Sequence, residues 1–104
     1  MAGDQPWSRG IYWRNTKSVN KGSIALLVIW LRSTSGSAKV NIYVEHATTF
    51  DKELFITTEI GTKWQQFIAP FDANNNYLSG ELTIGLHTGF KAQTIQIGGI
   101  ALSD

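Results

Sequence analysis

The sequence predicts an all-β domain, an antiparallel β-sandwich of about seven strands. Apolar residues recur at every second position through most of the chain, which is the side-chain period of a strand. Clusters of Gly, Ser, Asn and Asp separate these alternating segments at regular intervals and predict turns. No stretch carries the 3.6-residue period of an amphipathic helix, so the sheets must pack against each other.

The chain has 104 residues, which is enough for one domain and too few for two. We expect a single sandwich domain over residues 1–104, with 1–5 as a disordered tail. The chain has no cysteine, which excludes disulfides and thiolate metal sites. The formal net charge is +1 with both signs scattered, which argues against a nucleic-acid partner. The longest apolar run, near 24–31, is too short to span a membrane, and no signal peptide opens the chain.

The expected strands follow one another along the whole chain. They cover 9–15, 23–33, 38–46, 53–60, 64–71, 82–87 and 93–103. Pro70 predicts that the fifth strand stops or bulges there, because proline cannot donate to a sheet ladder. Gly98 and Gly99 predict a bulge or bend in the last strand. The polar segment 72–80 reads as a loop.

One candidate ligand face follows from placing segment 23–33 beside segment 38–46. Trp30 and Arg32 alternate with the core-facing residues of the first segment. Asn41, Tyr43 and Glu45 alternate in the same way in the second. An aromatic ring covers the apolar CH face of a sugar, while Arg, Asn and Glu bond its hydroxyls. We therefore expect these five side chains to form one platform for a polyhydroxylated ligand.

Further candidates for ligand contact come from other strands. His87 and Gln96 alternate away from their apolar neighbours and are expected to add polar contacts. Trp13 and Tyr12 point to opposite faces of the first strand, so only one of them joins a given surface, and Trp13 is taken as the candidate. Trp64 is expected in the core. For each candidate, the alternative to ligand contact is a purely structural role in packing or in pairing with a side chain of the neighbouring strand.

Catalysis is not expected from this sequence. A glycosidase needs two carboxylates that face each other across a cleft. Of the eight Asp and Glu residues, only Glu45 falls on the candidate ligand face. No nucleophile elbow, phosphate loop or metal-ligand cluster occurs. The two histidines have no carboxylate at metal-ligand spacing.

Several motifs resemble those of one known family. They are "KG" at Lys21 and Gly22 followed by "WLRS" at 30–33, then "TKWQQFIAPF" and "QTIQIGGI". Together the chain resembles the carbohydrate-binding module superfamily, with a jelly-roll, galactose-binding-like fold, whose nearest members in pattern are attached to xylanases and related hydrolases. The resemblance implies non-catalytic binding of plant-type polysaccharide on a concave sheet face. It implies no catalytic cofactor and only a structural role for any calcium. It also implies secretion if the chain is part of a larger hydrolase.

The chain departs from that family at its beginning. Family modules usually open with several earlier strands, so this chain resembles an N-terminally shortened member. A sandwich without those strands carries unpaired edges, and we expect two copies to form a homodimer that covers them. The alternative function is a structural or protein-interaction sandwich that self-associates and has lost the glycan site. A hydrolase is a weaker third reading.

Overall fold

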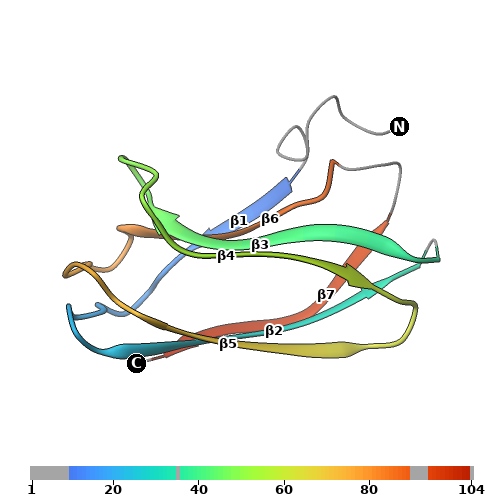
Figure 1. Cartoon of the computed structure of the whole chain (residues 1–104), viewed down its shortest axis with the longest axis horizontal. Coiled ribbons are helices and arrows are strands. Elements are labelled where there is room, and N and C mark those ends of the chain that lie inside the picture. Colours follow the sequence, from blue (N-terminus) through green and yellow to red (C-terminus); the bar gives the residue numbers. More distant parts are fainter. Residues whose placement is uncertain (1–9, 35, 90–93, 104) are drawn as a thin grey trace.

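The computed structural model describes residues 10–34, 36–89 and 94–103, and it contains seven strands (Figure 1). The strands are β1 (Gly10–Arg14), β2 (Ile24–Ser33), β3 (Ala38–His46), β4 (Lys52–Ile60), β5 (Gln65–Asp72), β6 (Leu82–His87) and β7 (Ile95–Ser103). They form a four-stranded sheet in the order β1-β6-β3-β4 and a three-stranded sheet in the order β5-β2-β7. All pairings are antiparallel. The predicted antiparallel β-sandwich of about seven strands is confirmed.

The expected tail at 1–5 lies outside the described residues. Within the described part of the chain there is no helix that could cross a membrane.

The core lies between the two layers seen in Figure 1. Its members are the alternate apolar residues of the strands together with a few loop side chains. The best-buried ones include Leu27, Ile29, Leu31, Val40, Ile42, Val44, Ile60, Tyr77, Leu82 and Leu86. Because side chains alternate between the two faces of a strand, the remaining residues point away from the core and form the two outer faces of the sandwich.

The expected pairing of β2 with β3 is wrong. β2 lies in the three-stranded sheet and β3 in the four-stranded sheet, so the segment between them carries the chain from one layer to the other (Figure 1). The core-facing residues of the two strands therefore face each other. Their outward residues consequently point in opposite directions, to the two opposite surfaces of the molecule.

The two irregularities predicted for the strands have different outcomes. The bulge at the glycine pair is confirmed: Trp30 lies opposite Gly99 and Leu31 opposite Ile97, which leaves Gly98 as the extra residue. The stop or bulge at Pro70 is wrong, because β5 continues to Asp72 without a register shift. β5 is an edge strand, and alternate amides of an edge strand have no ladder partner, so proline is tolerated there.

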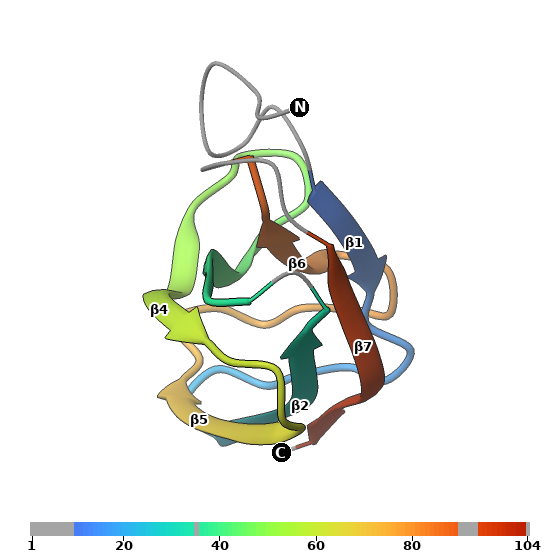
Figure 2. The same cartoon turned by 90° about the vertical axis from the view of Figure 1, so that its right-hand side faces the viewer.

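The two sides of the sandwich differ in how they close. β4 and β5 pack against each other on one side. On the other side, where Figure 2 shows β1 and β7, a cavity of about 450 Å³ lies between the layers. Its apolar lining includes Trp13, Val19, Ile84, Ile100 and Leu102. β1 and β7 are both edge strands of their sheets.

Candidate functional site

The outer face of the four-stranded sheet carries a row of aromatic residues. The strand register places Tyr12 of β1 opposite Gly85 of β6, Gly85 opposite Tyr43 of β3, and Tyr43 opposite Phe55 of β4. We call Tyr12, Gly85, Tyr43 and Phe55 the aromatic row. It runs across all four strands, over roughly 14 Å at the usual strand spacing.

The missing side chain at Gly85 shapes this row. A Cβ atom at position 85 would lie 2.5 Å from Cζ of Tyr43, so the Tyr43 ring covers the place that any other residue would fill. Tyr43 is only 8% exposed, whereas Tyr12 is 62% and Phe55 48% exposed. The row thus offers one open ring at each end. Burial and the neighbouring Glu45 raise the pKa of Tyr43, which keeps its hydroxyl protonated.

A row of neutral hydrogen-bonding residues lies on one side of the aromatic row. It consists of His87, Asn41 and Thr57, which are opposite one another in the register. Thr57 Oγ1 donates to Asn41 Oδ1 at 2.7 Å, and Asn41 Nδ2 lies 3.2 Å from His87 Nδ1. With the amide nitrogen as donor, Nδ1 accepts, which assigns the proton of neutral His87 to Nε2. The His87 ring lies 4.5 Å from the Tyr43 ring, centroid to centroid.

His87 is held neutral by its surroundings. Burial lowers its pKa from the ordinary 6.5, the charge of Glu45 opposes this shift, and Lys52 adds to it. The imidazole therefore serves this face as a neutral hydrogen-bonding group near pH 7.

A charged row lies on the other side of the aromatic row. It contains Arg14, Thr83, Glu45 and Lys52, again opposite one another. Lys52 Nζ lies 2.6 Å from Glu45 Oε1, and the Arg14 guanidinium carbon lies 5.3 Å from the centroid of the Tyr12 ring. The aromatic row is thus flanked on both sides by groups that donate or accept hydrogen bonds.

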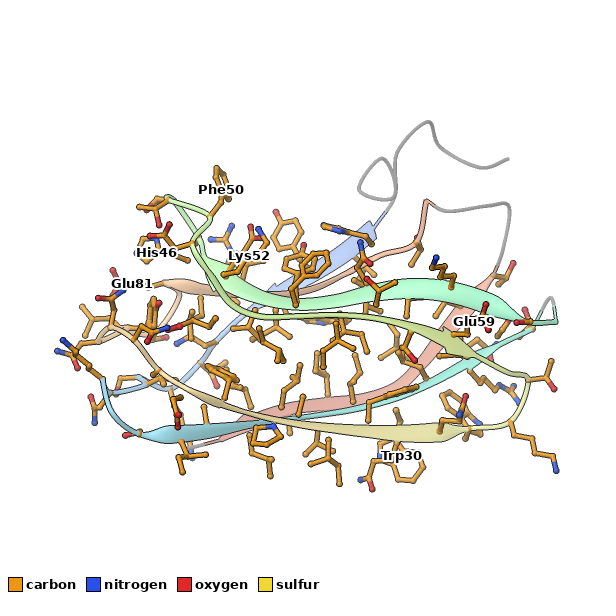
Figure 3. The ribbon with its side chains drawn as sticks, in the orientation of Figure 1. Trp30, His46, Phe50, Lys52, Glu59 and Glu81 are labelled. Atoms are coloured by element: carbon orange, nitrogen blue, oxygen red, sulfur yellow. The ribbon has the colours of Figure 1, made fainter. Side chains whose placement is uncertain are left out.

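The turn between β3 and β4 bounds this face beyond the charged row. Figure 3 shows Phe50 rising above the sheet there, and its side chain is 62% exposed. His46 Nδ1 accepts from the amides of Thr48 and Thr49, both at 3.1 Å, which fixes the start of the turn.

Trp30, Arg32 and Gln96 lie on the opposite surface, the outer face of the three-stranded sheet. Arg32 Nε donates to Gln96 Oε1 at 2.6 Å, and the guanidinium carbon lies 4.9 Å from the centroid of the Trp64 ring. Trp30 is 41% and Trp64 43% exposed. The expectation that Trp64 lies in the core is therefore wrong. The alternation along this segment also predicts an outward position for Trp64, because Phe67, Ala69 and Phe71 face inward and Trp64 is an odd number of residues away from each of them.

The expectation that five side chains of segments 23–33 and 38–46 form one platform is also wrong, because the two segments lie in different sheets. The structure brings Asn41, Tyr43, Glu45 and His87 together on the four-stranded sheet, and it places Trp30, Arg32 and Gln96 on the three-stranded sheet. It separates Trp13 from both groups, because Trp13 lies opposite Ile84 and lines the cavity at the β1–β7 side. The roles of all eight residues in ligand binding stay predictions.

Sequence reasoning missed several residues of the four-stranded face. They are Tyr12, Arg14, Lys52, Phe55 and Thr57. Alternation within 53–60 places Phe55 and Thr57 on the outward side, so this signal was present. Their alignment with Tyr43 and Asn41 depends on the pairing of β3 with β4.

The described residues contain no group of three or more His, Cys, Asp or Glu side chains placed to hold a metal ion. The expected structural role for calcium stays a prediction. Glu45 is paired with Lys52, so its closest charged partner is a cation and not a second carboxylate.

The chain has the fold of carbohydrate-binding modules, as comparison with solved structures shows. One match is described as "CBM4 structure and function", where CBM stands for carbohydrate-binding module: the TM-score is 0.77 at 17% identity, over 90% of this chain and 72% of that one. A second, "BiXyn10A CBM1 APO", also has a TM-score of 0.77, at 18% identity, over 100% of this chain and 68% of that one. No protein-family model matches the sequence, and no curated protein does.

Proposed function

We propose that this chain binds polysaccharide without cleaving it, through the outer face of the four-stranded sheet. The observation that carries the proposal is the aromatic row, with exposed rings at Tyr12 and Phe55 and hydrogen-bonding rows on both sides. A sugar ring has an apolar CH face and a rim of hydroxyls, so it needs this combination of surfaces. The fold shared with carbohydrate-binding modules supports the proposal.

The expected affinity is modest. Each stacked ring that removes on the order of 100 Å² of apolar surface from water contributes about 2.5 kcal/mol. Two exposed rings and several hydrogen bonds, less the loss of ligand freedom, correspond to a dissociation constant of roughly micromolar to millimolar. The row is long enough to contact more than one sugar ring of the same chain. Such a surface suits an extended polysaccharide better than a free monosaccharide.

The ligand class that we propose is neutral plant-type polysaccharide. Xylan is the first ligand to test, because one structural neighbour is the module of a xylanase. β-Glucans and mannans offer the same ring faces with different hydroxyl positions.

Affinity electrophoresis and isothermal titration against these three polysaccharides test the site. Tyr12→Ala combined with Phe55→Ala removes both open rings, and we expect at least a tenfold loss of affinity. Ile68→Ala is the matched control, because Ile68 is 57% exposed on the opposite face. Binding that survives the double substitution unchanged would rule out this site.

A second candidate function is self-association, and the open β1–β7 side favours it. Two edge strands flank a cavity there, whose lining joins apolar residues such as Trp13 and Ile100 to polar ones such as Arg14 and Lys17. An unpaired strand edge beside exposed apolar side chains is able to pair with a strand of another chain. Under this proposal a second copy covers that side, and the chain is a homodimer that acts as an interaction domain. Light scattering after size exclusion, over a range of micromolar concentrations, tests it. A monomer at every concentration contradicts self-association, and a dimer without any glycan response favours it over glycan binding.

A further inference from the structure

The outer face of the three-stranded sheet carries a second aromatic cluster, built around the bulge in β7. A Cβ atom at position 98 would lie 2.9 Å from Trp64 Cζ3 and 3.3 Å from Trp30 Cβ. Trp64 directly precedes β5, and β2 lies between β5 and β7, so the Trp64 ring reaches across β2. Trp30, Trp64 and Gly98 together line a shallow hollow between the two indoles. Glycine at this extra position therefore lets the Trp64 ring lie against β7, because a side chain there would meet the ring.

A positive charge lies beside the hollow. Arg32 bonds Gln96 through Nε and lies over the Trp64 ring, which fixes the guanidinium in place. Among the described residues Arg32 has no carboxylate partner, since the ion pair they show is Lys52–Glu45 on the other face. Asp72, a carboxylate of this face, is opposite Ile24, eight residues from Arg32 along β2, or roughly 27 Å. Within the part of the chain that the structure describes, the positive charge at the edge of the hollow thus has no carboxylate partner.

We propose that this hollow is a second sugar site, selective for sugars that carry a carboxylate. The indoles of Trp30 and Trp64 cover the CH face of the ring, and the Arg32 guanidinium receives the carboxylate through charge-assisted hydrogen bonds. Gln96 holds the guanidinium, and Gln66, opposite Trp30 in the register, is a neighbouring hydrogen-bonding group.

The consequence is a module with two sites on opposite surfaces. Figure 3 shows Trp30 on one side of the sandwich and Lys52 and Phe50 on the other. One chain is then able to contact two polysaccharide strands, or one acidic and one neutral region. The inference rests on the proposed function because both concern carbohydrate ligands. It adds a second binding site and a preference of that site for acidic sugars.

Xylan oligosaccharides with glucuronic acid side groups, and the same oligosaccharides after carboxyl reduction, provide the matched probes. Isothermal titration with the wild type is expected to give about tenfold tighter binding of the acidic form, the size of one charge-assisted contact. Arg32→Gln is expected to abolish this preference, and Lys21→Gln, which removes the same charge from an exposed turn, to keep it. Raising the salt concentration should weaken the preference. Gly98→Ala, whose methyl group would meet the Trp64 ring and displace it, should lower acidic binding with Arg32 still present.

The result that overturns the inference is equal binding of both forms, or a preference that survives Arg32→Gln. A change of oligomeric state in Arg32→Gln without any preference in the wild type would assign this face to a second copy instead. The proposed function fails separately, if Tyr12→Ala with Phe55→Ala leaves binding of the reduced, neutral form intact. Loss of neutral binding in that double variant, with the acidic preference retained, supports both sites.

Discussion

At position 85 the lack of a side chain allows the Tyr43 ring to lie over β6 and to continue the aromatic row. A methyl group there would meet the ring directly, and the well-packed surroundings of Tyr43 leave little room for it to move. The shape of the proposed binding face therefore depends on glycine at position 85, because any other residue would displace the Tyr43 ring.

Gly85→Ala is expected to lower the free energy of unfolding by about 1–3 kcal/mol, the usual range for overpacking, and to weaken polysaccharide binding. Urea denaturation and titration with xylan measure the two effects. Gly61→Ala is the control, because a Cβ at position 61 meets nothing within 4 Å. Equal stability of the two variants would contradict the packing of Tyr43 over Gly85.

His87 makes stability depend on pH. Its pKa in the folded chain lies below the ordinary 6.5, mainly through burial, so the unfolded chain binds the proton more readily. The free energy of unfolding should therefore fall as the pH drops from about 7.5, through 6.5, to the lower pKa that His87 has in the folded chain. Below that pKa, His87 is protonated in both the folded and the unfolded chain and should cause no further fall. Denaturation at a series of pH values checks this. His87→Gln should flatten this part of the profile, and His46→Gln, which removes the other histidine, should leave the fall in place.

At the scale of an element, the alternation along β2 decides what each position contributes. Ile29 is 1% exposed between the layers, whereas Ile24 in the same strand is 66% exposed on the outer face. Since burial removes apolar area from water and close packing adds contacts, the same residue type has different energetic weight at the two positions.

Ile29→Ala is expected to cost about 2–5 kcal/mol of unfolding free energy, and Ile24→Ala below about 1 kcal/mol. Chemical denaturation of the two variants gives the comparison directly. Similar losses at both positions would mean that the outer face of the three-stranded sheet is also covered, for example by a second copy.

At the scale of the whole molecule, the two outer faces point in opposite directions and carry different chemistry. The four-stranded face joins aromatic rings to neutral and paired charged groups. The three-stranded face joins indoles to an arginine and to aliphatic side chains such as Ile68. On the four-stranded face, Glu45 is paired with Lys52, and Glu59 of the same face lies opposite Lys39, six residues from Glu45 along β3. At about 3.4 Å per residue that is roughly 20 Å, wider than the separation of the two carboxylates of a glycosidase.

Incubation with xylan, β-glucan and mannan is therefore expected to release no reducing ends above the level of buffer alone, while the same samples show binding. The Glu45→Gln variant should likewise release no reducing ends, and only its affinity for polysaccharide should change. Measurable hydrolysis by wild type that Glu45→Gln abolishes would contradict a non-catalytic role and support the hydrolase reading.

The prediction from sequence was most accurate where the signal is local. The alternation that separates Leu27 and Ile29 from Trp30 predicted the inward face of β2 correctly, and the Gly98–Gly99 pair predicted the bulge. The same reasoning failed when it joined Trp30 with Tyr43, because neighbours in sequence are not always neighbours in a sheet.

By itself, the sequence determined the fold class, the strands and the inward side of β2, β3, β6 and β7, because the two-residue period follows from the backbone of a single strand. Only the tertiary structure decided which sheet each strand joins, and therefore which outward side chains meet. That choice depends on hydrogen bonding between distant segments and on the path of the chain across the core, and neither leaves a local pattern. For this reason Tyr12 and Phe55, which are 43 positions apart, share a face with Tyr43, while Trp30 lies on the other side.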